Sequence, residues 1–241
     1  MINANLLIND CTGRNSGLRS LKDGLVGHWP LTEVAEVGGK SGDISGSGLD
    51  LTISGASYTT DRHARADAAL SFDGLTDYLA VADNAILDLE DALTLATWVQ
   101  WDGVADTGAH RGVVKGNKVY GFRIYGSSHL TYPNVVMASL DNPDGGGGKS
   151  VRSSGGLPTN GTWAHVCMTY DKLLGSDNLK LYIDGVLDDS DDYNSSLTSD
   201  DDDFRVSFGV SSICMNGKVA DVRLYNRALT PAEVFSLTLQ G

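Results

Sequence analysis

The sequence is poor in cysteine and proline and has no long apolar run. It holds 3 Cys and 5 Pro among 241 residues. Cys11, Cys167 and Cys214 are too few and too scattered for a disulfide framework or a zinc site, and at least one thiol has no partner within a monomer. No apolar stretch reaches about 18 residues, so we expect no membrane span. The N-terminus lacks the basic segment and apolar core of a secretory signal, so we expect no signal peptide in this chain.

Positive charge is also scarce. The chain has 18 basic and 31 acidic residues, which gives a net charge of -13. Such acidity disfavours binding to nucleic acid and to anionic membrane surfaces. Only 4 of the acidic residues are Glu and 27 are Asp, alongside 29 Gly. Asp and Gly favour turns and loops over helices, so we expect short elements joined by acidic turns.

The common catalytic motifs are absent from the sequence. There is no G-x-S-x-G elbow, no phosphate-binding loop and no dinucleotide fingerprint. The 5 His are dispersed, with no H-x-H or H-E-x-x-H spacing. We therefore predict that the protein has no catalytic residues.

Alternating apolar residues predict about twelve strands, bounded by turn residues. The predicted strands are 25–31, 49–53, 69–72, 78–81, 93–101, 112–115, 120–125, 134–140, 163–170, 179–183, 204–210 and 218–225. Asp184-Gly185 predicts a two-residue hairpin turn after one of them. The inward side chains are expected to include Leu93, Leu95, Val99, Val166, Met168, Leu181 and Ile183.

A single short helix is predicted at the C-terminus. Thr230-Pro231-Ala232-Glu233 is a capping box with proline at the first helical position. Many strands and one short helix predict an all-β, two-sheet antiparallel β-sandwich of the jelly-roll type. The glycine run 145–148 and the acidic run 200–203 are expected to be loops, and the expected solvated turn contains Asp188, Asp189, Asp191 and Asp192.

Residues 1–24 differ in pattern from residues 25–241. They are polar with little periodicity, so we expect an N-terminal arm followed by one jelly-roll domain. Leu6-Leu7-Ile8 is the segment that we expect to add a strand to an exposed sheet edge, on its own domain or on a neighbouring subunit.

Six segments, in this order, resemble the laminin G-like, concanavalin A-like family. They are GLVGHWPLTE (24–33), LSFDG with DYL (70–79), LTLATWV (93–99), WAHVCMTYD (163–171), LKLYIDGV (179–186) and GKVADVRLYNRAL (217–229). The resemblance covers residues 24–239 and implies two curved antiparallel sheets with binding loops or a concave face on one side. The superfamily includes lectins, adhesion modules and glycoside hydrolases. The fold therefore does not decide the function, which has to be argued from individual residues.

The hydrolase branch of the family is disfavoured. It places a retaining carboxylate pair on one strand as E-x-D-x-E, where alternate residues share a face. None of the four Glu (Glu33, Glu36, Glu90, Glu233) heads such a pattern.

The resemblance implies a structural calcium ion. Similar jelly rolls carry one where the exit of the first strand approaches a strand near the C-terminus. The matching positions are Asp221, Glu33 and the Asp73-Gly74 turn. Calcium takes six to eight oxygens, so carbonyl groups and water would complete the site. In the alternative, Asp221 pairs with Arg223 or Lys218, or accepts hydrogen bonds from backbone amides.

Aromatic side chains offer a second kind of site, because a ring face packs against the CH face of a pyranose. Trp29, Trp98 and Trp163 lie in the strand motifs and are expected in the core. The candidate ligand-binding residues, near loops or strand ends, are Trp101, Tyr120, Tyr125, Tyr132 and Tyr193.

These features together predict a non-catalytic recognition or adhesion module that binds carbohydrate or a surface glycoconjugate. We expect it outside the cell or on a particle surface. The alternative is a structural decoration or fibre-type protein of a virus, phage or cell-surface layer, docked through residues 1–24. A glycoside hydrolase or lyase of the same fold is the third interpretation.

Overall fold

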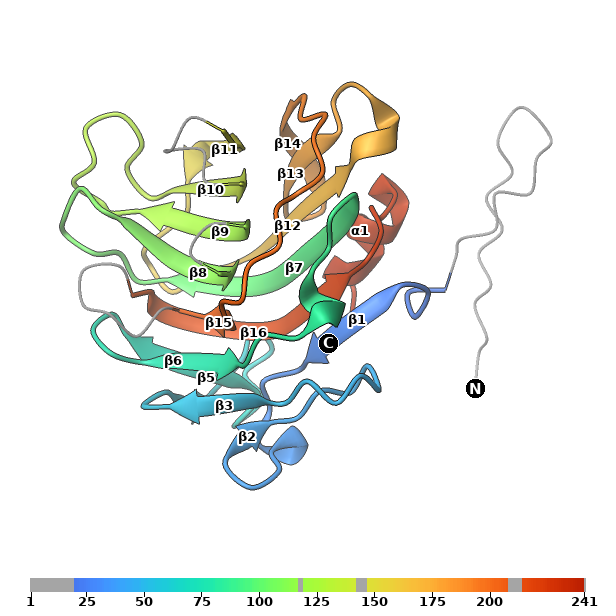
Figure 1. Ribbon diagram of the computed structural model, residues 1–241. Coiled ribbons are helices and arrows are strands. Elements are labelled where there is room, and N and C mark those ends of the chain that lie inside the picture. The colour runs from blue at the N-terminus through green and yellow to red at the C-terminus, as the bar shows by residue number, and fades with distance from the viewer. Residues whose placement is uncertain (1–19, 117–118, 142–146, 208–213, 241) are drawn as a thin grey trace.

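Two eight-stranded antiparallel sheets stack face to face (Figure 1). The computed structural model describes residues 20–116, 119–141, 147–207 and 214–240. Sheet A has the order β14-β13-β12-β7-β16-β5-β4, with β1 paired to β16. Its strands are β1 (Leu25–Trp29), β4 (Ser57–Thr59), β5 (Ala69–Asp73), β7 (Ala92–Trp101), β12 (Trp163–Asp171), β13 (Leu179–Ile183), β14 (Val186–Asp191) and β16 (Asn216–Tyr225).

Sheet B has the order β11-β10-β9-β8-β15-β6-β3-β2. Its strands are β2 (Lys40–Ser41), β3 (Leu51–Ser54), β6 (Tyr78–Val81), β8 (Ala109–Lys115), β9 (Tyr120–Tyr125), β10 (Val135–Leu140), β11 (Lys149–Gly156) and β15 (Phe204–Val206). The other elements are the 3-10 turns η1 (Glu33–Ala35), η2 (Ala85–Leu87) and η4 (Lys172–Leu174) and the helix α1 (Pro231–Thr238). None of the helices in the described ranges has the length and hydropathy that a bilayer crossing needs.

The main core lies between the sheets and confirms the predicted inward positions. The predicted side chains on β7, β12 and β13 all belong to this core, with Ile183 partly buried against it. Trp29 of sheet A stacks on Phe204 of sheet B, with 5.0 Å between ring centroids. Its indole Nε1 donates to the Leu49 carbonyl at 2.6 Å, so the largest core side chain leaves no buried donor unpaired.

The edges of the two sheets depart from the sequence prediction. No strand was predicted at β2, β4 or β11, which carry mostly polar residues. The predicted solvated turn at Asp188, Asp189 and Asp191 is wrong, because these residues belong to β14. Asp189 accepts a hydrogen bond from the Arg152 amide at 2.9 Å, and Asp188 accepts from the Ser154 amide and hydroxyl. The carboxylates of one edge strand therefore tie it to β11, the edge strand of the other sheet.

The turn between β13 and β14 forms as predicted. Asp184 and Gly185 have φ values of 51° and 79°. Positive φ at both central residues defines the type I′ turn that joins two right-twisted strands, which is why Asp-Gly is favoured there.

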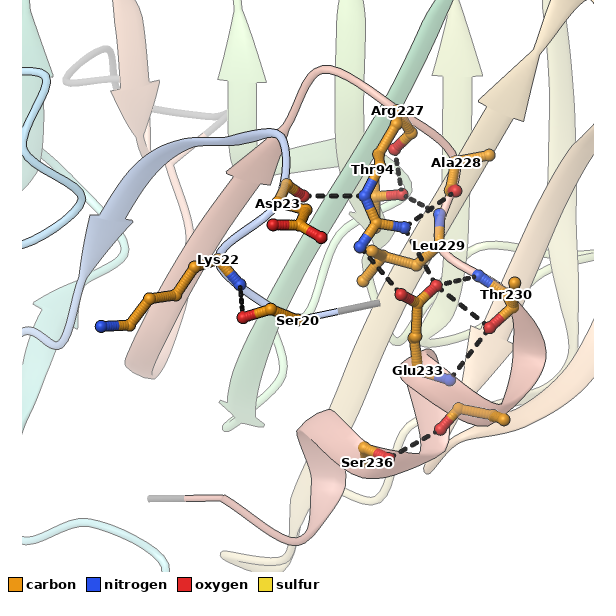
Figure 2. Close-up of polar contacts among 11 residues, drawn as sticks. Ser20, Lys22, Asp23, Thr94, Arg227, Ala228, Leu229, Thr230, Glu233 and Ser236 are labelled. Carbon is orange, nitrogen blue, oxygen red and sulfur yellow. Dashed lines mark hydrogen bonds and ion pairs between the residues drawn. The ribbon is translucent and has the colours of Figure 1, made fainter. Parts of the chain in front are cut away.

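The predicted C-terminal capping box is also present (Figure 2). The Thr230 hydroxyl accepts from the Glu233 amide at 3.3 Å, and Glu233 accepts from the Thr230 amide at 2.8 Å. Arg227 donates to both carboxylate oxygens of Glu233 and, through Nε, to the Asp23 carbonyl at 2.7 Å. Residues 20–24 of the predicted arm therefore contact their own domain, whereas residues 1–19 lie outside the described residues.

Helix α1 covers the outer face of sheet A. A second apolar cluster joins them and contains Ala96, Cys167, Tyr182, Tyr225, Leu229, Val234 and Leu237, with Leu21 and Leu25 packed against it. Both described cysteines, Cys167 and Cys214, are buried. Helix α1 therefore covers part of the outer face of sheet A and none of the described strands of sheet B.

Candidate functional site

Tyr125, His129 and Tyr132 form an aromatic cluster where β9 leads into β10. Tyr125 ends β9, and the other two lie in the following loop. The His129 ring centroid lies 4.5 Å from that of Tyr125 and 5.5 Å from that of Tyr132, and the two tyrosine rings are 5.6 Å apart. We call these three residues the aromatic cluster. Two of the five predicted ligand-binding residues thus lie side by side.

Hydrogen bonds hold the aromatic cluster in place. The His129 Nδ1 accepts from the backbone amides of Thr131 and Tyr132, at 3.3 and 3.0 Å. The Tyr125 hydroxyl donates to the Met137 sulfur at 3.4 Å on the neighbouring strand. The rings are therefore fixed by their own loop and by β10, which lowers the entropy that a ligand would have to remove.

The surface of the aromatic cluster suits an amphipathic ligand. Tyr132 is 36% exposed, and the Arg152 guanidinium lies 5.2 Å from its ring centroid. Leu130, in the same loop, is 97% exposed. An exposed ring beside a charged fork can pack against a sugar CH face and bind its oxygen atoms at the same time.

The other predicted ligand-binding residues are held inside the domain. Trp101 and Tyr120 are fully buried and donate to the Asn134 side chain and the Leu87 carbonyl. Their ring faces are covered by the core, which corrects the prediction that they lie free near strand ends. Tyr193 is 9% exposed, and its hydroxyl donates to Asp141 at 2.6 Å.

Two tryptophans expected in the core lie elsewhere. Trp98 and Trp163 are only partly buried, because they occupy the outward positions of β7 and β12. Arg62 covers the Trp98 ring at 4.2 Å from its centroid. Trp163 lines a groove of about 250 Å³ between the end of β11 and the β13–β14 turn, which also contains Ser154, Leu157, Pro158, Ile183, Asp184 and Asp188. Strict alternation from Leu95 and Val99 would have placed Trp98 outward.

Asp221, the first predicted calcium ligand, is an ion-pair partner. His28 Nε2 donates to its Oδ1 at 2.7 Å, and Arg223 donates to both carboxylate oxygens at 3.0 Å. Burial alone would raise the pKa of this carboxyl, but the hydrogen bond from His28 and the charge of Arg223 lower it to about 2. This is the arrangement of the alternative, in which Asp221 pairs with Arg223.

The remaining predicted ligands, Glu33, Asp73 and Gly74, lie on two other segments of the chain. Glu33 is exposed in η1. The Asp73 carboxylate caps its own turn by accepting from the amides of Leu75 and Thr76. Gly74 packs against Asn216, the β16 partner of Asp73.

The geometry separates Asp73 from Asp221. Asn216 precedes Asp221 by five positions on β16, which is roughly 16 Å of strand. In the described parts of the chain, no group of three or more His, Cys, Asp or Glu side chains is arranged to hold a metal ion. Calcium binding at Asp221 stays a prediction, and an ion there would have to displace His28 or Arg223 from the carboxylate.

A lysine lies under the acidic run 200–203. The Lys115 side chain is fully buried, and its ammonium donates to Asp83 at 2.7 Å and to the carbonyls of Asp200 and Asp202 at 2.9 and 2.6 Å. Asp88 lies 3.8 Å away. Burial alone would lower the pKa of Lys115, but the hydrogen bonds to Asp83 and Asp200 raise it above its ordinary value. The ammonium thus occupies the place that a bound cation would take.

The two stacked antiparallel sheets define a concanavalin A-like jelly roll. The chain belongs to the concanavalin A-like lectin/glucanases superfamily, whose family model matches residues 72–235. No curated protein sequence matches this chain.

Solved structures show the same fold at low sequence identity. The binding domain of Paraclostridial Mosquitocidal Protein 1 aligns with a TM-score of 0.69 at 17% identity, over 90% of this chain and 52% of that one. Domain 4 of a GH43 extracellular arabinanase from Geobacillus stearothermophilus, in complex with arabinotriose, aligns with a TM-score of 0.65 at 18% identity, over 89% and 98% of the two chains.

A third structure comes from work on cell entry of botulinum neurotoxin type C through two ganglioside molecules. It aligns with a TM-score of 0.64 at 14% identity, over 90% of this chain and 51% of that chain. This protein therefore spans about half the length of the two toxin chains. At these identities the likeness shows the fold alone.

Proposed function

We propose that this protein is a non-catalytic carbohydrate-binding module that acts outside the cell or on a particle surface. The observation that carries the proposal is the aromatic cluster, in which Tyr132 presents an exposed ring beside the Arg152 guanidinium. The arabinotriose complex of one structural relative and the ganglioside dependence of another support a sugar ligand.

The test is a titration with a panel of oligosaccharides, in which binding is measured by intrinsic fluorescence and by calorimetry. Tyr132→Ala removes the exposed ring and should weaken binding by up to about tenfold, since a stacked ring contributes roughly 0.5–1.5 kcal/mol beyond its buried area and about 1.4 kcal/mol is a factor of ten. Tyr132→Phe keeps the ring and should bind almost as the wild type does. Equal affinity in Tyr132→Ala and wild type would place the site away from the aromatic cluster.

The Trp163 groove provides the matched comparison. Trp163→Ala removes an aromatic side chain of the groove at the β13–β14 turn without touching the aromatic cluster. We expect it to leave the affinity unchanged. If Trp163→Ala abolishes binding and Tyr132→Ala does not, the groove is the sugar site.

The absence of catalysis is tested separately. Incubation of the protein with each bound oligosaccharide should yield no shorter products by chromatography. Cleavage that survives repeated purification would instead favour a glycoside hydrolase or lyase.

A further inference from the structure

Four arginines gather on the outer face of sheet B. In the strand register, Arg152 of β11 lies opposite Met137 of β10, Met137 opposite Arg123 of β9, and Arg123 opposite Arg111 of β8. Arg205, on the next strand β15, lies opposite Val114 of β8. We call Arg111, Arg123, Arg152 and Arg205 the arginine row.

The arginine row points away from the core. Residues directly opposite each other in an antiparallel ladder share a face, and successive residues alternate. The neighbours of Arg123 and Arg205 along their strands, Phe122 and Ile124, and Phe204 and Val206, belong to the main core. A bulge in β8 between Arg111 and Val114 keeps both on the outer face.

The guanidinium groups are close enough to feel one another's charge. Burial, together with the charges of Arg123 and Arg205, lowers the pKa of Arg111 to about 10, while Asp202 acts in the opposite direction. Arg111 and Arg123 are 8% and 6% exposed, so they form the floor of the row. Arg152 and Arg205 are more exposed and flank them. Four of the 10 Arg of a chain with net charge -13 are thus concentrated on one sheet face.

Aromatic rings adjoin both ends of the arginine row. Arg152 lies over Tyr132 of the aromatic cluster, and Arg205 lies 5.3 Å from the ring centroid of Tyr78 on β6. Tyr125 follows Arg123 by two positions on β9 and therefore shares its face. The row and the aromatic cluster therefore lie on the same face of sheet B.

We propose that the arginine row binds the acid groups of an anionic oligosaccharide, one that carries carboxylate or sulfate groups. This inference rests on the proposed carbohydrate function and names its ligand class. One sugar ring packs on the aromatic cluster, and the chain runs across β10 and β9 towards β8. Arginine suits this role because its planar fork pairs with carboxylate or sulfate oxygens through two hydrogen bonds. Aromatic rings at both ends can pack against the CH faces of sugars, which favours a sugar ligand. The net negative charge of the protein repels long polyanions and so disfavours a phosphate polymer.

The test compares four probes on the full chain by calorimetry. They are a uronic acid oligosaccharide, a sulfated oligosaccharide of the same length, its neutral analogue and a single-stranded DNA of matched charge. We expect binding of a uronate or sulfated probe at least tenfold tighter than binding of the neutral analogue or the DNA. Tightest binding by the DNA would show general anion binding and would overturn the inference.

Charge-matched variants locate the site. Arg123→Gln and Arg152→Gln should each weaken acidic-sugar binding by about tenfold, as the loss of a charge-assisted hydrogen bond does. Lys218→Gln removes the same charge from β16 on the other sheet and should leave the affinity unchanged. Because Arg123 is nearly buried, melting curves accompany each variant, and Arg152→Gln, which is more exposed, decides the result if Arg123→Gln does not fold.

The outcomes separate the two proposals. Binding of the neutral analogue that depends on Tyr132 but not on the arginines would overturn the ligand class and keep the carbohydrate function. Failure of every oligosaccharide to bind would overturn the carbohydrate function. Equal losses of affinity in Lys218→Gln and Arg152→Gln would show that net charge alone attracts the ligand. That result would also overturn the proposal that the arginine row is the binding site.

Discussion

Lys115 and Arg111 lie on the same strand, and both are nearly buried, but they face opposite sides of sheet B. Lys115 points inward and is surrounded by Asp83, Asp88 and Asp200, at 2.7, 3.8 and 3.1 Å from its ammonium. Arg111 points outward and lies near the like charges of Arg123 and Arg205. The surrounding charges raise the pKa of Lys115 and lower that of Arg111.

This contrast separates a cation held by buried carboxylates from the cations that we propose to hold a ligand, of which Arg205 also pairs with Asp203 at 2.9 Å. A buried charge surrounded by opposite charges resists removal, because its partners would be left without compensation. Like charges gathered on one face cost folding free energy, and an anionic ligand that binds there lowers that cost. Within this sheet the two roles are divided between the inner and the outer face.

The largest effect on stability is expected for Lys115→Met. Removing one member of a buried ion pair costs about 3–5 kcal/mol, because the carboxylates that remain keep their desolvation penalty. Urea denaturation of wild type and variant measures this difference. Lys149→Met is the control, since its pair with Asp191 is partly exposed and should contribute less than about 1 kcal/mol. Similar losses of unfolding free energy in Lys115→Met and Lys149→Met would show that the buried Lys115 does not hold the fold more strongly than a partly exposed lysine.

Ligand-induced stabilisation sharpens the same comparison. A ligand present at a hundred times its dissociation constant stabilises the folded state by about 2.7 kcal/mol. The acidic oligosaccharide should therefore raise the melting temperature of the wild type and of Lys115→Met. It should stabilise Arg123→Gln about half as much, because tenfold weaker binding leaves about 1.4 kcal/mol. A response lost in Lys115→Met but kept in Arg123→Gln would reverse the assignment of the two faces.

The fold could be predicted from the sequence because its signals are local. Two-residue alternation, the Asp184-Gly185 turn and the Thr230 capping box each depend on neighbouring residues only. The polar edge strand β11 was missed because its pairing partner, and not its own pattern, makes it a strand.

The binding surface was only partly predictable. Proximity to loops suggested Tyr125 and Tyr132, whose rings lie 5.6 Å apart, but it also suggested Trp101, which the core buries. The arginine row left no sequence signal, because its members lie on four separate strands. Their alignment depends on the strand register and on one bulge in β8, which no local pattern specifies.

Asp221 offers a third, intermediate case in which a buried carboxylate is compensated by cations. Its folded pKa of about 2 lies below the ordinary 3.8. It therefore contributes about 2 kcal/mol of stability above pH 4, which is lost as the pH falls towards about 2. Asp221→Asn should remove this contribution and flatten the acid side of the stability curve. Asn is the suitable replacement because it tolerates the φ of 53° at this position. If the acid side of the stability curve is the same in Asp221→Asn as in the wild type, other carboxylates cause the loss of stability at low pH.

The same variant tests the calcium prediction. If an ion binds at Asp221, calcium should raise the melting temperature of the wild type by mass action and should leave that of Asp221→Asn unchanged. Chelator would reverse the shift in the wild type. A melting curve that neither calcium nor chelator moves would leave Asp221 as the partner of His28 and Arg223 alone.

The smallest effect is expected on the covered face of sheet A, where helix α1 packs against the sheet. Thr230→Ala removes the hydroxyl that caps the Glu233 amide, whereas Arg227 still holds the Glu233 carboxylate. Loss of such a cap costs about 1 kcal/mol. Thr230→Ser keeps the hydroxyl and should be close to wild type, and both variants should bind the acidic oligosaccharide normally, because α1 lies on the sheet opposite the arginine row. A loss of binding in Thr230→Ala would show that the two outer faces are coupled and that the division between a structural face and a binding face is wrong.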